Sequence, residues 1–187
     1  RPFSEDWTRR HQTPLWGRRN GGMVKQEESA SIATGLQPIT MAFGGGKGGV
    51  GKSLVCASVA IELCRRNLRV VAVDADLGAP NLHTLLGMLH PAKTFAEFFD
   101  SEDVSLADLC LETAIPGLRL LSGTAGLVPT LQRESASRRR LMQAILSLEA
   151  DVILMDLGAG THRDTLDLYT MAGHRIIVTS PEPTSIQ

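Results

Sequence analysis

One glycine-rich stretch, residues 43–53, has residue types and a spacing that could bind phosphate. It reads Phe-Gly-Gly-Gly-Lys-Gly-Gly-Val-Gly-Lys-Ser, and residues 46–53 match the P-loop pattern G-x-x-x-x-G-K-[ST]. Glycines let the backbone wrap closely around a phosphate, and the N–H groups then point inward as an anion-binding nest. In such a loop Lys52 reaches the β- and γ-phosphates, and the Ser53 hydroxyl binds Mg²⁺. We therefore predict that phosphate is bound by Gly46, Lys47, Gly48, Gly49, Val50, Gly51, Lys52 and Ser53.

Two other interpretations of this stretch are open. It could be a flexible glycine loop that binds nothing, although glycines with Lys-Ser at the required positions between a strand and a helix argue against that. It could also belong to a dinucleotide-binding fold, because Gly44, Gly46 and Gly49 fit G-x-G-x-x-G and Asp74 follows at a second strand end. The dinucleotide interpretation gives no role to Lys52 and Ser53, so we favour the P-loop.

A carboxylate further along the chain could complete a metal site. Residues 152–155 are Val-Ile-Leu-Met, and Asp156 follows them directly. A buried strand of this kind delivers its terminal carboxylate to the rim of a sheet, where it can hold Mg²⁺ directly or through water. An aspartate that only caps the next turn is the alternative. After a P-loop we expect Asp156 to be a metal residue.

The elements that must position these residues alternate between strand and helix. Short apolar runs predict buried strands, and polar-apolar patterns between them predict helices. This alternation implies a three-layer, doubly wound α/β fold, with a mostly parallel sheet and helices on both faces. Ligands then bind beyond the carboxyl ends of the strands. The predicted strands are 39–43, 69–73, 118–121, 152–155 and 175–179, and the predicted helices are 54–66, 94–99, 106–110, 135–148 and 166–172.

Length and composition fit one domain with a leader. The 187 residues carry a net charge of −1 and 43% hydrophobic residues, with no apolar run long enough to span a membrane. Residues 1–37 hold arginine pairs and no apolar periodicity, so we predict a disordered leader and a folded domain over 38–187. A nucleic-acid-binding arm is the alternative for the leader, but we expect no direct nucleic-acid contact. The three cysteines form no C-x-x-C pair, which fits a reducing, cytoplasmic setting.

Residues 47–53 resemble the deviant Walker A motif of the MinD/ParA family of P-loop ATPases. The distinguishing residue is Lys47, which an ordinary P-loop does not need. In that family this lysine crosses to the phosphates of the partner subunit in an ATP-bound sandwich dimer. Residues 74–78, Asp-Ala-Asp-Leu-Gly, resemble the family's switch I segment, in which the second aspartate positions the attacking water. That role maps onto Asp76.

A second segment narrows the resemblance to one branch. Residues 156–161, Asp-Leu-Gly-Ala-Gly-Thr, resemble switch II, but Gly158 stands where many family members have proline. This form and residues 181–185 are closer to the FlhG branch of flagellar-number regulators. The resemblance covers residues 39–187. Because the family continues with further strands and, in many members, a membrane-targeting helix, we expect this chain to be C-terminally truncated and not to bind membranes.

The resemblance implies a MgATP-binding, slowly hydrolysing dimerisation switch. Lys47, Lys52 and Asp76 would act in catalysis, and Ser53, Asp76 and Asp156 at the metal. An unidentified protein partner would regulate the ATPase, in flagellar placement, cell division or partition. The alternatives are a nucleotide-binding scaffold without turnover and an iron–sulfur-carrier ATPase of the same superfamily. The second alternative needs clustered cysteines, and none follows Cys110.

Overall fold

The computed structural model describes residues 37–76, 78–101, 103–123, 135–160 and 163–181. The predicted leader therefore lies outside the described residues except for Gln37, and the domain division stays a prediction. All helices and strands of the described ranges lie within residues 39–177.

The fold is built on a six-stranded sheet with the order β3-β4-β2-β5-β1-β6. All neighbouring pairs are parallel except β3 and β4, which are antiparallel. Crossover connections of this kind bring the carboxyl ends of the parallel strands, and the loops that leave them, to one edge of the sheet. The strands are β1 (Ile39–Gly44), β2 (Val70–Ala75), β3 (Cys110–Glu112), β4 (Leu118–Leu121), β5 (Val152–Leu157) and β6 (His174–Ile177).

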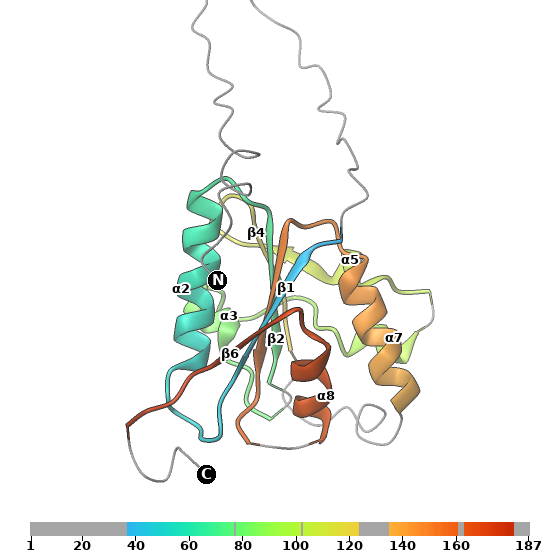
Figure 1. Cartoon of the computed structure of the whole chain (residues 1–187). Coiled ribbons are helices and arrows are strands. Elements are labelled where there is room, and N and C mark those ends of the chain that lie inside the picture. Colours follow the sequence, from blue (N-terminus) through green and yellow to red (C-terminus); the bar gives the residue numbers. More distant parts are fainter. Residues whose placement is uncertain (1–36, 77, 102, 124–134, 161–162, 182–187) are drawn as a thin grey trace, which may run out of the picture. The chain divides into compact units, whose positions relative to one another are not determined.

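Helices cover both faces of the sheet, as predicted for a doubly wound fold. One face is covered by α2 (Lys52–Arg65) and α3 (Leu82–Leu85). In Figure 1, α2 lies to one side of the strands, while α7 and α8 lie to the other. The helices of that second face are α4 (Glu97–Asp100), α5 (Leu106–Leu109), α7 (Ser135–Leu146) and α8 (Arg163–Met171).

The core consists of two apolar layers separated by the sheet. Alternate residues of one strand enter different layers: Val71 and Val73 of β2 pack with α7 and α8, whereas Val70 and Ala72 pack with α2. The central strands β2 and β5 are buried along their whole length. Continuous apolar runs are what a parallel strand needs when both of its faces are covered.

The structure corrects several predicted boundaries. Helix α2 begins at Lys52 and not at 54, and α8 begins at Arg163 and not at 166. Strand β2 runs to Ala75 and β5 to Leu157, because pairing continues past the apolar runs through Asp74 and Asp156. Both aspartates therefore lie inside the strands.

One strand was not predicted. Residues 110–112 form β3, which pairs antiparallel with β4 through Leu111 and Leu120, whereas helix was predicted up to residue 110. The connection turns at Gly117, whose φ of 83° is readily available only to glycine. Strand β6 is also shorter and earlier than predicted, at His174–Ile177.

Candidate functional site

The carboxyl ends of β1, β2 and β5 meet at one edge of the sheet. Asp156 of β5 is paired with Phe43 of β1 on one side and with Asp74 of β2 on the other. The glycine-rich stretch leaves β1 at Gly44 and enters α2 at Lys52. The predicted P-loop, the predicted metal residue and the predicted switch I segment are therefore brought together at this edge.

The loop between β1 and α2 needs glycine at particular positions. Gly49 and Gly51 have φ of 78° and 92°, a region that other residues rarely adopt. A Cβ on Gly45 would lie 2.6 Å from the carbonyl oxygen of Val178, which is closer than real contacts allow. The glycine content of the stretch thus follows from its backbone path.

The amino end of α2 is open to an anion. Gly51 is its N-cap, no side chain caps the helix, and its first turn contains no acidic residue. The first N–H groups of a helix lack partners within the helix, and together with the helix dipole they attract negative charge. Phosphate bound at this point would satisfy them.

Lys52 and Asp156 are the charged side chains at the base of the loop. The Lys52 residue is only 7% exposed, and Asp156 is 1% exposed. Both carboxylate oxygens of Asp156 are buried without a hydrogen-bond partner among the described residues. A buried charge without partners is strongly unfavourable, so these groups fit a site that a metal ion and phosphate oxygens complete.

Burial also changes the pKa of Asp156. Desolvation raises the pKa of this carboxyl to about 6, while the nearby Ser53 hydroxyl and Lys52 ammonium lower it and Asp76 raises it. Ser53 is therefore close enough to favour the charged form, although within the described part of the chain it makes no hydrogen bond of good geometry to Asp156. Mg²⁺ prefers oxygen ligands, and the Ser53 hydroxyl and the Asp156 carboxylate supply such oxygens at this position.

Asp76 lies at the start of the loop that follows β2. Its Oδ1 accepts hydrogen bonds from the N–H groups of Gly78 and Ala79, both at 3.0 Å. Gly158 of the predicted switch II lies against it, since a Cβ there would be 3.2 Å from the same oxygen. Asp76 therefore sits between the two predicted switch segments. Its assignment to water positioning and to the metal stays a prediction.

Asp74 is a residue of this site that sequence reasoning did not assign. It is fully buried, and burial raises its pKa to about 7, while the N–H of Leu82 lowers it and Asp156 raises it. The available signal was the spacing Asp-x-Asp at a strand end, which places the first carboxylate within the sheet. The Cys56 thiol of α2 lies near both buried carboxylates, and its pKa is raised by burial and then by Asp156 and Asp74.

A cleft of about 820 Å³ opens above these residues. That volume is within the usual range for small-molecule sites. Of the predicted site residues, Gly48, Gly49, Gly51, Lys52, Ser53 and Asp76 line it, together with Leu54, Ala75, Gly78, Ala79, Asn81, Leu85, Gly158, Ala159, Thr165 and Leu168. Gly46, Lys47, Val50 and Asp156 are not among the lining residues.

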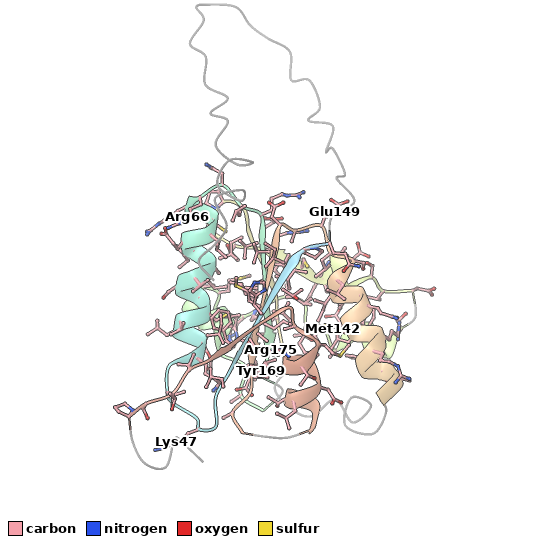
Figure 2. All side chains as sticks on the ribbon, viewed as in Figure 1. Lys47, Arg66, Met142, Glu149, Tyr169 and Arg175 are labelled. Atoms are coloured by element: carbon pink, nitrogen blue, oxygen red, sulfur yellow. The ribbon has the colours of Figure 1, made fainter. Side chains whose placement is uncertain are left out.

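Lys47 is exposed at the far tip of the loop, and Figure 2 shows its side chain at the margin of the domain, away from the sheet. The structure therefore does not bring Lys47 together with Lys52 in the cleft. Its predicted reach toward a partner subunit stays a prediction.

The loop is tied to its surroundings by main-chain hydrogen bonds. The Gly160 N–H of switch II donates to the Gly45 carbonyl at 3.1 Å, and the Val178 N–H donates to the Gly44 carbonyl at 2.9 Å. The Tyr169 ring of α8 leaves little room for a side chain at Gly44, where a Cβ would lie 3.1 Å from the ring. The P-loop is thus fixed to switch II and packed against α8.

The three cysteines lie on two elements of the described ranges. Cys56 and Cys64 are buried on α2, Cys110 is half-buried on β3, and no group of three or more His, Cys, Asp and Glu that could hold a metal is found there. A P-loop magnesium site does not need such a group, because phosphate oxygens and water supply most of its ligands. Among the described helices, none is long and apolar enough to cross a membrane.

Comparisons with known proteins agree with this arrangement. Residues 38–187 match the ParA family model, described as NUBPL iron-transfer P-loop NTPase. The chain is 33% identical over 154 residues to the antiactivator FleN of Pseudomonas aeruginosa, covering 81% of this chain and 54% of FleN. It is 29% identical over 150 residues to the flagellum site-determining protein YlxH of Helicobacter pylori, covering 78% and 49%. The chain thus spans about half the length of the curated relatives it matches.

A solved structure shares the fold. The septum site-determining protein MinD of Pyrococcus horikoshii, in complex with Mg-ADP, has a TM-score of 0.68 and 27% identity, over 79% of this chain and 60% of that protein. The residues matched by the family model include the sheet, the P-loop and both switch segments. The chain therefore belongs to the ParA family of P-loop NTPases, with a domain of the MinD-like fold.

Proposed function

We propose that this chain binds MgATP in the cleft and hydrolyses it slowly, and that ATP controls its dimerisation. The observation that carries the proposal is the convergence of Lys52, Ser53 and Asp156 under an open helix end, with both Asp156 oxygens buried and unpartnered among the described residues. The relative from Pyrococcus horikoshii was solved with Mg-ADP, which supports the same ligand class here.

The phosphates would be held by the loop and by Lys52. The main-chain N–H groups of 48–53 would surround the β- and γ-phosphates, and the buried Lys52 ammonium would donate charge-assisted hydrogen bonds to them. Ser53 and Asp156 would hold Mg²⁺, directly or through water. When bound, this ion offsets the negative charge that develops on the phosphate oxygens.

Asp76 would orient the water that attacks the γ-phosphate. Its Oδ1 is engaged by the amides of Gly78 and Ala79, so Oδ2 is the oxygen that would face the water. Positioning of this kind and charge stabilisation are the main protein contributions to phosphoryl transfer. We expect slow turnover because Lys52 is the only cationic side chain among the described residues that line the cleft, unless Lys47 of a second copy supplies another.

The exposed position of Lys47 supports a role between subunits. A lysine at the tip of the P-loop can reach the phosphates of a facing copy more easily than its own. We propose an ATP-dependent homodimer on this basis. We further propose a cytoplasmic regulator of the position or number of a cell structure, acting with a protein partner, because YlxH and a MinD relative are named site-determining proteins and FleN is named an antiactivator.

The competing function is a nucleotide-binding scaffold without turnover. Release of radiolabelled phosphate from ATP by the wild-type chain separates the two, with Asp76→Ala as the variant that should release phosphate far more slowly while keeping binding. Lys93→Ala is the matched control, because Lys93 donates to the Asp108 carbonyl and does not line the cleft. Phosphate release by wild type and by Lys93→Ala, but not at a comparable rate by Asp76→Ala, supports the ATPase. Binding without release in all three contradicts it.

A further inference from the structure

The residue that the proposed function leaves unused is Asp74. It lies directly beside the candidate metal residue Asp156 in the sheet, yet it is 0% exposed and does not line the cleft. Asp156 is buried to a similar extent, but its two oxygens have no partner among the described residues, whereas both oxygens of Asp74 already accept main-chain hydrogen bonds. Any contribution it makes to chemistry has to act through its neighbours.

Those neighbours are the two ends of the switch I loop. The Asp74 Oδ2 accepts a hydrogen bond from the Leu82 N–H at 3.0 Å, and its Oδ1 accepts one from the Asp76 N–H at 3.4 Å. Leu82 is the first residue of α3, where a helix leaves its N–H groups without partners. The preceding residue, Asn81, does not cap α3, since its side chain donates to the Ala79 carbonyl. Asp74 therefore supplies the cap from a neighbouring strand.

The loop that Asp74 closes contains the side chain predicted to orient water. Within it, Asp76 Oδ1 accepts hydrogen bonds from the amides of Gly78 and Ala79. The Asp76 main chain is thus held by Asp74, and its carboxylate is held by the loop's own turn. Gly158 limits the space on the remaining side. The position of the Asp76 carboxylate depends on both aspartates.

We propose that Asp74 is a positioning residue for ATP hydrolysis: its two carboxylate oxygens hold both ends of the loop 76–82, and this fixes Asp76 in the cleft. The inference rests on the proposed ATPase function for its kinetic consequence. It does not rest on that function for its structural consequence, which is that the Asp76 and Leu82 N–H groups are held by Asp74 without nucleotide. The two consequences are measured separately.

The kinetic test uses Asp74→Asn, which keeps the side-chain shape but replaces one acceptor oxygen by an NH₂ group that faces an N–H. We expect kcat for ATP to fall about tenfold, the effect of losing one hydrogen bond, with KM changed by less than about twofold. On an Asp76→Ala background the same change should have no further effect, because Asp74 acts through Asp76. A merely structural role would lower activity on both backgrounds. An unchanged kcat, or a double variant that loses the product of the two single effects, would overturn the proposal.

Amide hydrogen exchange of residues 76–82 without nucleotide is the second test. We expect exchange in Asp74→Asn to be about tenfold faster than in wild type, because the loop loses an anchor. Asp151→Asn is the matched control, since Asp151 also accepts a main-chain N–H, from Arg69 at 2.8 Å, but at the opposite end of β5. It should leave exchange of the loop unchanged. Equal exchange in wild type and Asp74→Asn overturns the proposal.

Two further outcomes are separable. A wild-type chain that does not hydrolyse ATP would contradict the proposed function, and the exchange result alone would then decide whether Asp74 holds the loop. If Asp74→Asn does not unfold cooperatively on heating, Asp74→Ser, which keeps a smaller acceptor, replaces it in both measurements.

Discussion

Asp74 and Asp156 occupy paired positions on the neighbouring strands β2 and β5, and both are buried. Loss of solvent on burial is the main reason why the pKa of Asp74 is raised to about 7 and that of Asp156 to about 6. The Asp156 carboxylate adds to the rise at Asp74, and the Asp76 carboxylate adds to the rise at Asp156. When both carboxyl groups are ionised and no cation is bound, their burial destabilises the folded chain. Binding of Mg²⁺ by the Asp156 carboxylate would offset that cost.

The stability of the nucleotide-free chain should therefore decrease as pH rises. Because the pKa values of both groups are raised from 3.8 in the folded state, the folded chain binds more protons than the unfolded chain between about pH 4 and 7. The contribution of the two carboxyl groups to the free energy of unfolding is complete below their pKa in the unfolded chain. It is lost as pH rises through their pKa values in the folded chain. Thermal unfolding between about pH 5 and 8 checks this sign.

Asp156→Asn is the variant that tests the assignment. Its melting temperature should fall less over that pH range than that of wild type, because one titrating carboxyl is gone. Addition of Mg²⁺ and nucleotide should stabilise wild type more at the higher pH, where Asp156 is ionised. Parallel pH profiles for the two proteins would show that Asp156 does not titrate in this range.

Gly45→Ala should destabilise the fold. The added Cβ would lie 2.6 Å from the main-chain oxygen of Val178, and neither backbone can move without disturbing the Val178–Gly44 hydrogen bond. We expect a loss of about 1–3 kcal/mol in the free energy of unfolding, as for other overpacked sites. Gly48→Ala is the matched control, since its Cβ would meet only the Ala159 Cβ at 4.0 Å. Chemical denaturation of the two variants checks the contrast.

Ile177→Lys should reduce aggregation. Strand β6 is at the edge of the described sheet, and Ile177 is 70% exposed on it. An edge strand with an exposed apolar residue can pair with another chain, and a lysine blocks that pairing. Light scattering over time at raised temperature should show slower growth of large particles for the variant. A variant that aggregates at the wild-type rate would place the association surface elsewhere.

Lys47→Ala should keep ATP binding and lose ATP-dependent dimerisation. Lys47 lies outside the cleft lining, so its own nucleotide loses no contact within the chain. Sedimentation or multi-angle light scattering with ATP and with ADP measures the mass of each species. Wild type should dimerise with ATP only. Dimers of Lys47→Ala with ATP would refute the intersubunit role.

Local motifs were enough to predict which residues meet at the candidate phosphate site. Each motif can be recognised from neighbouring residues alone. The glycine stretch has the backbone freedom that a phosphate-binding loop needs, and the apolar run before Asp156 predicts a buried strand that ends in a carboxylate. The lysine in the first turn of α2 and the carboxylate at the end of β5 accordingly meet where the motifs imply. The alternation of strands and helices was likewise enough to predict a mostly parallel sheet.

What could not be predicted depends on contacts between distant residues. Asp74 has the same type and neighbourhood as Asp76, and only the pairing of β2 with β5 and the Leu82 amide show that one is enclosed and the other is not. The antiparallel strand β3 is short and half-buried, so it has no strong period of its own. The approach of Gly158 to Asp76 is set by how two loops cross, which no single segment encodes.

Calorimetric titration of MgATP into wild type and Lys52→Ala tests the central claim most directly. The buried Lys52 ammonium is the charged donor assigned to the phosphates, so its removal should weaken binding by at least about tenfold, the effect of losing a charge-assisted hydrogen bond. The control Lys93→Ala should bind as wild type does. MgATP affinity unchanged in Lys52→Ala, with wild type and Lys93→Ala binding equally, would contradict the assignment of the cleft as the phosphate site.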